Sequence, residues 1–299
     1  MTQRKWYGKD TGLSVRMLLT GALLMIVYLA FLTILSFYVG YTFLLIFAAL
    51  FVFIQFYFSD KLVLISSGAK LVTPQEAPQL HTLVERLCSI ADLPKPRVAV
   101  INSAVPNAFA TGRNQKSAVV AVTTGLLNKL NLQELEAVVG HELTHVKNRD
   151  VMVITIASFL STVAWFIMRF SLYSSAFRGG NRNKGAGAGI LIFLASLLVW
   201  LISYLLIRAL SRYREFAADR GSAIITGNPS ALIAALLKIS GAMERVPTKD
   251  LRDVEGLNAF FIIPALSAGS IMNLFSTHPP IEKRIARLEA MERTREGFR

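Results

Sequence analysis

The sequence contains few charged residues and almost no cysteine. Charged side chains make up 17% of the 299 residues, below the roughly 25% of a soluble domain, while hydrophobic residues make up 53%. This balance excludes a disordered chain and argues against a purely soluble protein. The one cysteine, Cys88, cannot form an internal disulfide, so nothing requires an oxidising compartment. We expect Cys88 to fill a small apolar space in a helix.

Acidic residues are scarce as well. The chain has 19 aspartates and glutamates against 32 lysines and arginines, which gives a net charge of +13. In a soluble protein this excess would suggest a nucleic-acid partner. Here the apolar residues form long blocks, so the basic excess predicts contact with lipid headgroups and no nucleic-acid partner.

The longest block without a charged residue is segment 17–59. A single helix of these 43 residues would be about 65 Å long, twice the roughly 30 Å hydrocarbon core of a bilayer. The block therefore predicts a transmembrane hairpin of two spans with its turn near Gly40. Basic residues precede the first span and none lies in the turn, which predicts a cytoplasmic segment 1–16 and a return to the cytoplasm after the second span.

A second apolar pair occupies segment 151–207. Its uncharged runs, Val151–Met168 and Gly185–Ile207, are each long enough to span a bilayer. The connector between them carries four basic residues and no acidic one, and the positive-inside rule favours keeping such a connector in the cytoplasm. Two alternatives stay open: a hairpin that crosses the membrane, and a hairpin that lies at its cytoplasmic interface.

The polar remainder falls into two stretches, 60–150 and 208–299, which we expect to assemble into one domain. Apolar periodicity predicts helices at Gln75–Ala91, Pro229–Met243 and Ile281–Glu296. Short runs rich in β-branched and small apolar residues predict strands at Arg97–Ile101, Asn107–Thr111 and Ser117–Thr123. The predicted fold class is α+β, mainly α-helical, with two to four transmembrane helices and a small sheet. His81 has polar neighbours and is expected at the surface.

The most informative motif is the run HELTH at 141–145. A capping-box pattern at Asn131 predicts that this run lies on a helix. His141 and His145 then share one face, where two imidazoles can bind one zinc ion, and Glu142 can reach a water molecule on that ion. The alternative is a surface helix with two ordinary histidines.

A catalytic zinc ion needs a third protein ligand and keeps its fourth position for water. The run REFAAD at 214–219 places Glu215 and Asp219 one helical turn apart. Glu215 can then bind zinc, while Asp219 accepts the second ring N–H of a ligating histidine. Either form of the second hairpin brings His145 and Glu215 to within about 10 Å of the same membrane edge. The alternative is an exposed charge cluster at the membrane boundary.

Together these motifs resemble the HtpX-type zinc metallopeptidases, membrane relatives of the CAAX prenyl endopeptidases. The resemblance covers nearly the whole chain and includes HELTHVKNRD at 141–150, REFAAD at 214–219 and THPPIEKR at 277–284. It implies a gluzincin-like catalytic domain with one Zn²⁺ per chain. The implied metal ligands are His141, His145 and Glu215, and the implied catalytic acid/base is Glu142.

The resemblance also implies roles for residues outside these motifs. His278 and Arg284 match a His-Pro motif and a following arginine, and are candidates for stabilising the transition state; a turn histidine and a solvated helix charge are the alternatives. Asn107 and Ala108 begin a run that resembles the family's substrate-aligning edge strand. A peptide that pairs with such a strand gains main-chain hydrogen bonds whatever its sequence. Asn107 as a simple turn residue is the alternative.

The function implied by the resemblance is that of a membrane-bound endopeptidase. It would cleave misfolded or damaged membrane proteins, and itself, at the cytoplasmic face of the cell membrane. Its partners would be polypeptides and the lipid bilayer. Zinc-activated water would attack the peptide bond while Glu142 accepts a proton and passes it to the leaving amine.

Two other functions compete with this one. A site-2-type protease cuts within the bilayer and needs its zinc helix to be an apolar span, whereas Lys147, Arg149 and Asp150 follow the HELTH run directly. A non-enzymatic metal-binding scaffold or transporter would be expected to place polar residues inside its spans, and segment 17–59 has no charged residue.

Overall fold

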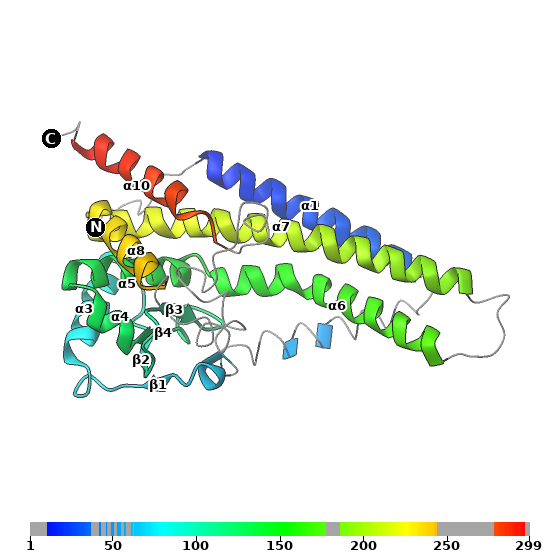
Figure 1. Ribbon diagram of the computed structural model, residues 1–299, viewed down its shortest axis with the longest axis horizontal. Helices are drawn as coiled ribbons and strands as arrows, with labels where there is room; N and C mark the ends of the chain where they lie inside the picture. Colours follow the sequence, from blue (N-terminus) through cyan, green and yellow to red (C-terminus); the bar gives the residue numbers. More distant parts are fainter. Residues whose placement is uncertain are drawn as a thin grey trace. The chain divides into compact units, whose positions relative to one another are not determined.

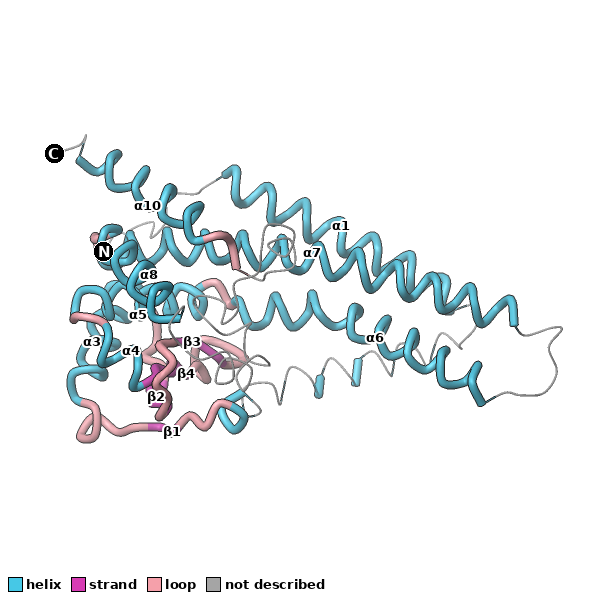
Figure 2. The backbone as a smooth tube through the Cα atoms, in the orientation of Figure 1, coloured by secondary structure: helices cyan, strands magenta, loops and turns pink. Residues whose placement is uncertain are grey.

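The computed structural model describes residues 11–36, 63–177, 186–243 and 278–296, together with single positions between 42 and 61. These residues belong to two compact units. The first unit takes its residues from Tyr57–Met152 and Ser211–Arg299, and the second from Thr11–Phe56 and Val153–Leu210. Helices dominate both ribbon and tube views (Figures 1 and 2), and strands occur only in the first unit among the described residues.

The first unit is built on a four-stranded mixed sheet with strand order β1-β2-β4-β3. The strands are β1 (Lys70–Leu71), β2 (Arg97–Ile101), β3 (Ala108–Thr111) and β4 (Val119–Thr123). β2 and β4 run parallel, and β1 and β3 pair antiparallel with them on the outside. β3 is therefore an edge strand, paired with β4 on one side and with no other strand in the part of the chain that the structure describes.

Helices cover one face of this sheet. The helices of the first unit are α3 (Pro78–Ala91), α4 (Thr124–Lys129), α5 (Leu132–Lys147), α8 (Pro229–Met243), α10 (Ile281–Glu296) and the last part of α7 (Ala186–Thr226). Side chains alternate along each strand, so Val98 and Val120 join the core formed with α3, α5 and α8. Ala99 and Val119 face the other way, into a smaller cluster with residues 63–69.

Most of the predicted elements are confirmed, and the differences lie at their ends. β2, α8 and α10 have the predicted bounds. The helix predicted from Gln75 begins instead at Pro78, because proline lacks the N–H that a helix interior uses and suits the first helical position. β1 and α4 were not predicted, since two and six residues are too few to show a periodicity.

The capping box that starts α5 is confirmed. The Asn131 side chain accepts from the Glu134 backbone N–H, and the Glu134 carboxylate accepts from the Asn131 N–H, both at 2.9 Å. α5 ends at Lys147, and a short turn follows in which Arg149 has φ 55°. A left-handed conformation is unusual for a residue with a side chain, and here it separates α5 from α6 (Asp150–Phe177).

Two side chains of α3 test the burial predicted from its sequence, and only one of the two agrees with it. Cys88 is buried, as expected of an apolar filler, and burial raises the pKa of its thiol to about 11. The prediction of a surface position for His81 is wrong: only 8% of the residue is exposed, and its Nε2 lies 3.0 Å from the Val72 carbonyl oxygen. His81 follows Leu80 at the border of the buried face, where the segment leading into the helix covers it.

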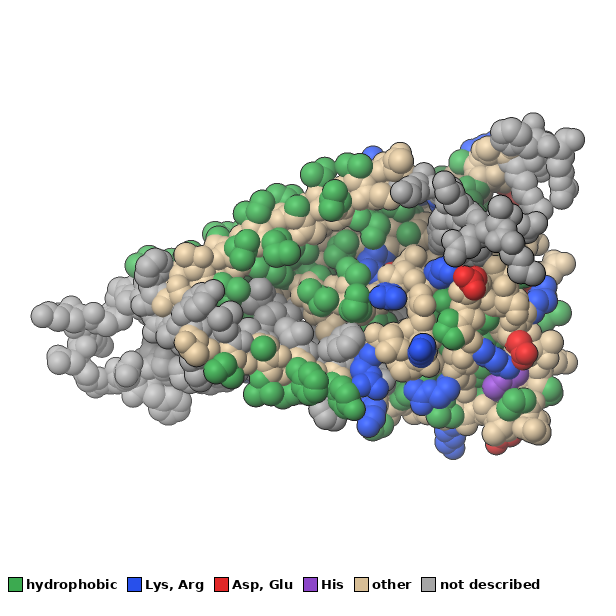
Figure 3. Space-filling model, turned by 180° about the vertical axis from the view of Figure 1, so that it is seen from behind, with side chains coloured by type: hydrophobic (Ala, Val, Ile, Leu, Met, Phe, Trp, Pro, Cys, Tyr) green, Lys and Arg blue, Asp and Glu red, His purple; other side chains and the backbone are tan. Residues whose placement is uncertain are grey.

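The second unit contains helices that are long and apolar enough to cross a membrane. Among the described residues the candidate spans are Thr11–Ile34 in α1 (Thr11–Ser36), Asp150–Arg169 in α6 and Ile190–Thr226 in α7. Leu24, Phe31 and Ala164 belong to its buried core. Hydrophobic side chains such as Leu18 and Leu191 stay exposed on the outside, and the space-filling view shows these helices largely covered by such side chains (Figure 3). This fits insertion into lipid and confirms the predicted membrane class.

Parts of the predicted membrane topology lie outside the described residues. These are the turn near Gly40, nearly all of the second span of the first hairpin, and the middle of the connector between α6 and α7. Both helices of the second apolar pair are longer than predicted, because α6 continues past Met168 to Phe177 and α7 past Ile207 to Thr226. The choice between a spanning and an interfacial hairpin stays a prediction.

Within the first unit, α5 and α7 approach closely at a glycine. A Cβ atom added to Gly140 would lie 3.3 Å from both the Ser222 hydroxyl oxygen and the Thr226 methyl carbon. Next to this contact the Ser222 hydroxyl donates to the Ala137 carbonyl oxygen at 2.5 Å. The absence of a side chain at position 140 thus lets the helix with the HELTH run lie directly against the helix with Glu215.

We predict that Gly140→Val lowers the apparent Tm of the detergent-solubilised protein by about 2–10 °C, because overpacking costs roughly 1–3 kcal/mol. The matched control is Gly241→Val on α8, where an added Cβ has no neighbour within 4 Å. Equal Tm values for the two variants would show that the close approach at Gly140 does not matter for stability.

Candidate metal centre

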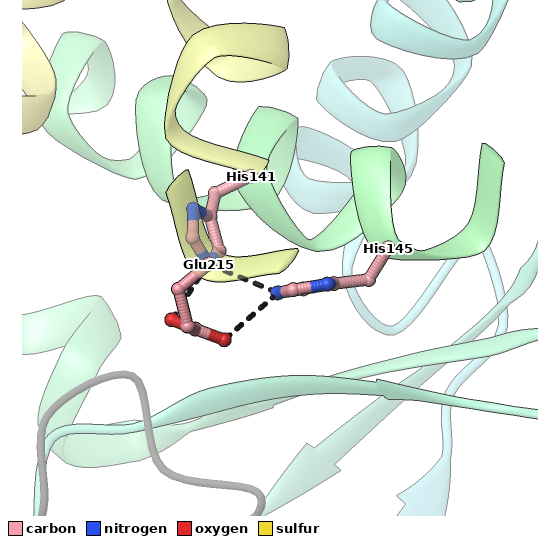
Figure 4. A group of neighbouring side chains, drawn as sticks. All are labelled: His141, His145 and Glu215. Atoms are coloured by element: carbon pink, nitrogen blue, oxygen red, sulfur yellow. Dashed lines mark hydrogen bonds and ion pairs between the residues drawn. The ribbon is translucent and has the colours of Figure 1, made fainter. Parts of the chain in front are cut away.

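Three predicted ligand side chains meet in the first unit. His141 and His145 extend from one face of α5 and Glu215 from α7, and their ends point toward one another (Figure 4). The two Nε2 atoms lie 3.1 Å apart. The Glu215 carboxylate oxygens lie 3.6 Å from Nε2 of His141 and 3.4 Å from Nε2 of His145. One ligand atom from each residue thus lies within 4.8 Å of the other two.

These distances fit a single tetrahedral metal ion. Zinc binds imidazole nitrogen and carboxylate oxygen at about 2.0–2.2 Å, so two ligand atoms on one tetrahedral ion lie about 3.3 Å apart. The three separations of 3.1, 3.4 and 3.6 Å bracket that value. Two nitrogens and one carboxylate oxygen are also the donor set of a catalytic zinc site with one open position.

Each imidazole is oriented by a carboxylate on its other nitrogen. Nδ1 of His141 lies 3.0 Å from Asp219, and Nδ1 of His145 lies 2.6 Å from Asp150. An N–H on Nδ1 leaves the Nε2 lone pair directed toward the cluster, as a metal ligand requires. Asp219 occupies the place predicted for it. Asp150 is not among the predicted site residues. An acidic residue at the start of an apolar segment needs a partner, and this is the signal that could have indicated its role.

Two buried arginines hold these carboxylates in turn. Arg284 donates to Asp219 through Nε at 2.8 Å and Nη2 at 2.6 Å, and its Nη1 lies 3.5 Å from Glu215. Arg214 forms an ion pair with Asp150. Both arginines are at most 3% exposed. The alternative of a solvated helix charge is therefore wrong for Arg284, and its guanidinium faces two carboxylates.

His278 also lies beside the cluster. Its Nδ1 is 3.1 Å from a Glu215 oxygen, and the residue is 5% exposed. The Pro-Pro sequence after it leads into α10, so the same short segment delivers both His278 and Arg284. Thr277, the first residue of the THPPIEKR run, lies outside the described residues.

The buried groups of this site carry an excess of negative charge. Its four carboxylates are Glu142, Asp150, Glu215 and Asp219, each at most 7% exposed. With neutral histidines, the two guanidiniums of Arg214 and Arg284 leave a formal charge of −2. Buried charges are stable only when they are paired or bind metal ions. A divalent cation at the three converging ligand atoms would bring this formal charge to zero.

Glu142 follows the first histidine and lies beside the cluster. The residue is 4% exposed, and burial raises the pKa of its carboxyl group. The backbone N–H of Ala110 on β3 donates a hydrogen bond to this carboxyl group. Glu142 therefore lies between the three ligand side chains and the edge strand.

The open side of β3 faces this glutamate. The Thr123 N–H donates to the Asn107 carbonyl oxygen at 2.9 Å, which makes 107 and 123 a hydrogen-bonded pair of the ladder. Because such pairs alternate in antiparallel strands, the backbone groups of Ala108 and Ala110 point away from β4. Asn107 itself is 5% exposed, and its backbone is held by Thr123. A small surface pocket between the end of β3 and the end of α5 has His145 in its lining.

This combination of membrane helices, a HELTH helix and an edge strand defines a membrane-associated peptidase. The chain belongs to peptidase family M48, whose model matches residues 74–292. It is of the HtpX type: it is 60% identical to Protease HtpX homolog 2 of Methanosarcina mazei over 291 residues, which cover 97% of this chain and 98% of that protein. It is 59% identical to Protease HtpX homolog of Moorella thermoacetica over 298 residues, covering 99% and 100%.

A solved structure supports the same fold. The crystal structure of S. mikatae Ste24p matches with a TM-score of 0.50 and 20% identity, over 89% of this chain and 67% of that one. The competing interpretations find no such support. α5, which carries the HELTH run, is not among the described helices that are apolar enough to span a membrane, as a site-2-type protease would need. Membership of a peptidase family argues against a non-enzymatic scaffold.

We predict that the purified protein contains one zinc ion per chain and that Glu215→Ala loses most of it, because two imidazoles alone leave the ion without its third ligand. Elemental analysis after gel filtration measures the ratio. The matched control, Glu289→Ala, removes a half-exposed carboxylate on α10 and should keep the full metal content. An equal zinc content in both variants would exclude Glu215 as a ligand.

Proposed function

We propose that this protein is a zinc-dependent endopeptidase that uses His141, His145 and Glu215 as metal ligands. The observation that carries the proposal is the convergence of the three ligand atoms beside a buried Glu142 in an M48-family chain. Zinc, when bound, supplies the Lewis acidity that makes water a competent nucleophile near neutral pH. Asp219, whose Oδ1 lies 3.0 Å from Nδ1 of His141, would fix the orientation of that ring.

Glu142 moves the proton in this proposal. Its carboxylate accepts a proton from the attacking water and then gives it to the nitrogen of the leaving amine. Burial raises the pKa of this carboxyl group, which makes its carboxylate a stronger base for the first transfer. His278 and Arg284 remain the candidates for stabilising the negative charge that develops on the carbonyl oxygen. The contacts of Arg284 with Asp219 and Glu215 add a second role, that of holding these carboxylates in place.

The open edge of β3 is the proposed substrate platform. A peptide in extended conformation can pair with the outward N–H and carbonyl of Ala108 and the outward carbonyl of Ala110, beginning next to Asn107. This pairing uses main-chain atoms only, so it selects for an extended chain and not for a particular sequence. It would bring the peptide next to Glu142, whose carboxyl group accepts from the Ala110 N–H.

We propose the cytoplasmic face of the cell membrane as the place of cleavage. The basic residues before α1 predict that orientation, and the helices of the second unit supply the anchor. A membrane-anchored peptidase with a sequence-tolerant platform suits misfolded or damaged membrane proteins, and a second copy of the same chain would be accepted as well, as self-cleavage.

We predict that Glu142→Gln keeps its zinc and loses hydrolysis of an unfolded protein such as casein by a factor of about 10²–10⁴, the usual contribution of a general base. The control is Glu136→Gln on the same helix, whose carboxylate pairs with Arg86 and not with the cluster. Undiminished hydrolysis by the Glu142 variant would remove this residue from the mechanism.

We also predict that Ala108→Pro lowers kcat/KM for an unfolded substrate by about 2–10-fold, because it removes one outward backbone donor worth roughly 0.5–1.5 kcal/mol. Proline is tolerated on the outward side of an edge strand. Ala108→Gly keeps the N–H and serves as the control. If both variants cleave like the wild type, peptides do not use this edge.

A further inference from the structure

The two histidines of the cluster differ in how firmly the fold holds them. The His141 side chain is 1% exposed and lies in the middle of α5, whereas that of His145 is 16% exposed and lies two residues before the helix ends at Lys147. Helix ends fray, and the chain beyond this end passes through the left-handed Arg149. Packing alone therefore leaves the ring of His145 with more freedom than that of His141.

One side chain compensates for this freedom. Asp150, the first residue of α6, reaches back across the turn, and its Oδ2 lies 2.6 Å from Nδ1 of His145. Its other oxygen forms an ion pair with Arg214. Asp150 is 7% exposed and Arg214 3%, so both charges depend on this pairing.

We propose that Asp150 and Arg214 form a positioning pair for the metal site. Asp150 accepts the Nδ1–H of His145 and thereby fixes both the ring orientation and the tautomer that presents Nε2 to the metal. Arg214 fixes Asp150 from α7, one residue before the ligand Glu215. The inference rests on the proposed metal site and assigns to this pair the task of completing it.

The pair also sets the register between the ligand-bearing helices. Asp150 is five residues after His145, and Arg214 directly precedes Glu215, so their contact connects the end of α5 to the turn of α7 that carries the third ligand. The contacts on the other histidine have the same form, with Asp219 on His141 and Arg284 on Asp219. Each imidazole thus has its own carboxylate and each carboxylate its own arginine.

The main test is the zinc affinity of Asp150→Asn, measured by competition with a chromophoric chelator. An amide presents weaker acceptor character to His145 and leaves Arg214 without its counter-charge, so we expect zinc to bind about 10–100-fold more weakly. Glu136→Gln on α5 is the matched control and should bind zinc like the wild type. Unchanged affinity in Asp150→Asn would overturn the proposal.

Arg214 provides a second and milder variant. We expect Arg214→Lys, which keeps the positive charge, to bind zinc more tightly than Arg214→Met, because only the lysine can still hold Asp150 in place. The absorption spectrum of the Co²⁺-loaded protein should change in Arg214→Met, since it reports the geometry of the ligand atoms directly. Equal zinc affinities and unaltered Co²⁺ spectra in both variants would show that Arg214 has no positioning role.

A purely structural role can be separated from a positioning role by comparing Tm with and without metal. A structural pair would lower the Tm of the metal-free and zinc-loaded forms of Asp150→Asn equally and leave zinc affinity intact, which would overturn the proposal. If the pair positions the ligand, Asp150→Asn should reduce mainly the increase in Tm that zinc produces. The wild type separates the proposed function from the proposed positioning pair. Failure of the wild type to bind zinc overturns the proposed function, whereas a defect confined to hydrolysis leaves the positioning pair intact.

Discussion

The burial of negative charge is the constraint on which this site depends. Four carboxylates lie close in space to two imidazoles, and all four are almost fully buried. Water would stabilise such groups, and the protein interior does not, so each one needs a specific partner. Arg284 neutralises Asp219, Arg214 neutralises Asp150, and Glu142 and Glu215 have no guanidinium to themselves. This excess of negative charge supports the proposed divalent cation, which would neutralise the carboxylates together with the two arginines.

The fold meets this constraint by close contact between helices that are distant in sequence. α5 supplies two ligands and α7 the third, and Gly140 removes the side chain that would separate them. His278 in the segment before α10 and Arg284 in the first turn of α10 come from the far end of the chain. The sheet contributes differently: its edge strand presents backbone atoms next to Glu142, so in the proposed mechanism substrate binding and proton transfer would take place side by side.

The sequence predicts the local parts of this arrangement better than the long-range ones. The spacing of His141 and His145 follows from helical periodicity, and the capping box at Asn131 marks where that helix begins, so both are readable from neighbouring residues. Glu215 is predicted from the need for a third ligand and from its one-turn spacing to Asp219, and the second hairpin supports it by returning the chain to the membrane edge near His145. Asp150 and Arg214 could not be predicted in the same way, because their contacts depend on the turn at Arg149 and on the packing of α5 against α7. His81 was misplaced for a similar reason, since a segment outside its own helix covers it.

The backbone groups of β3 that point away from β4 have a consequence for the kind of molecule that the proposed peptidase could cleave. Pairing with Ala108 and Ala110 would require several consecutive residues whose own amide groups are not already hydrogen-bonded. In a transmembrane helix every such group is already bonded within the helix, and the apolar surroundings offer no water in exchange. If substrates bind in this way, an intact helical membrane protein would resist cleavage, and one that has begun to unwind would not. Selectivity of this type would depend on the conformation of the target, so the sheet edge would bind unfolded segments and leave folded ones alone.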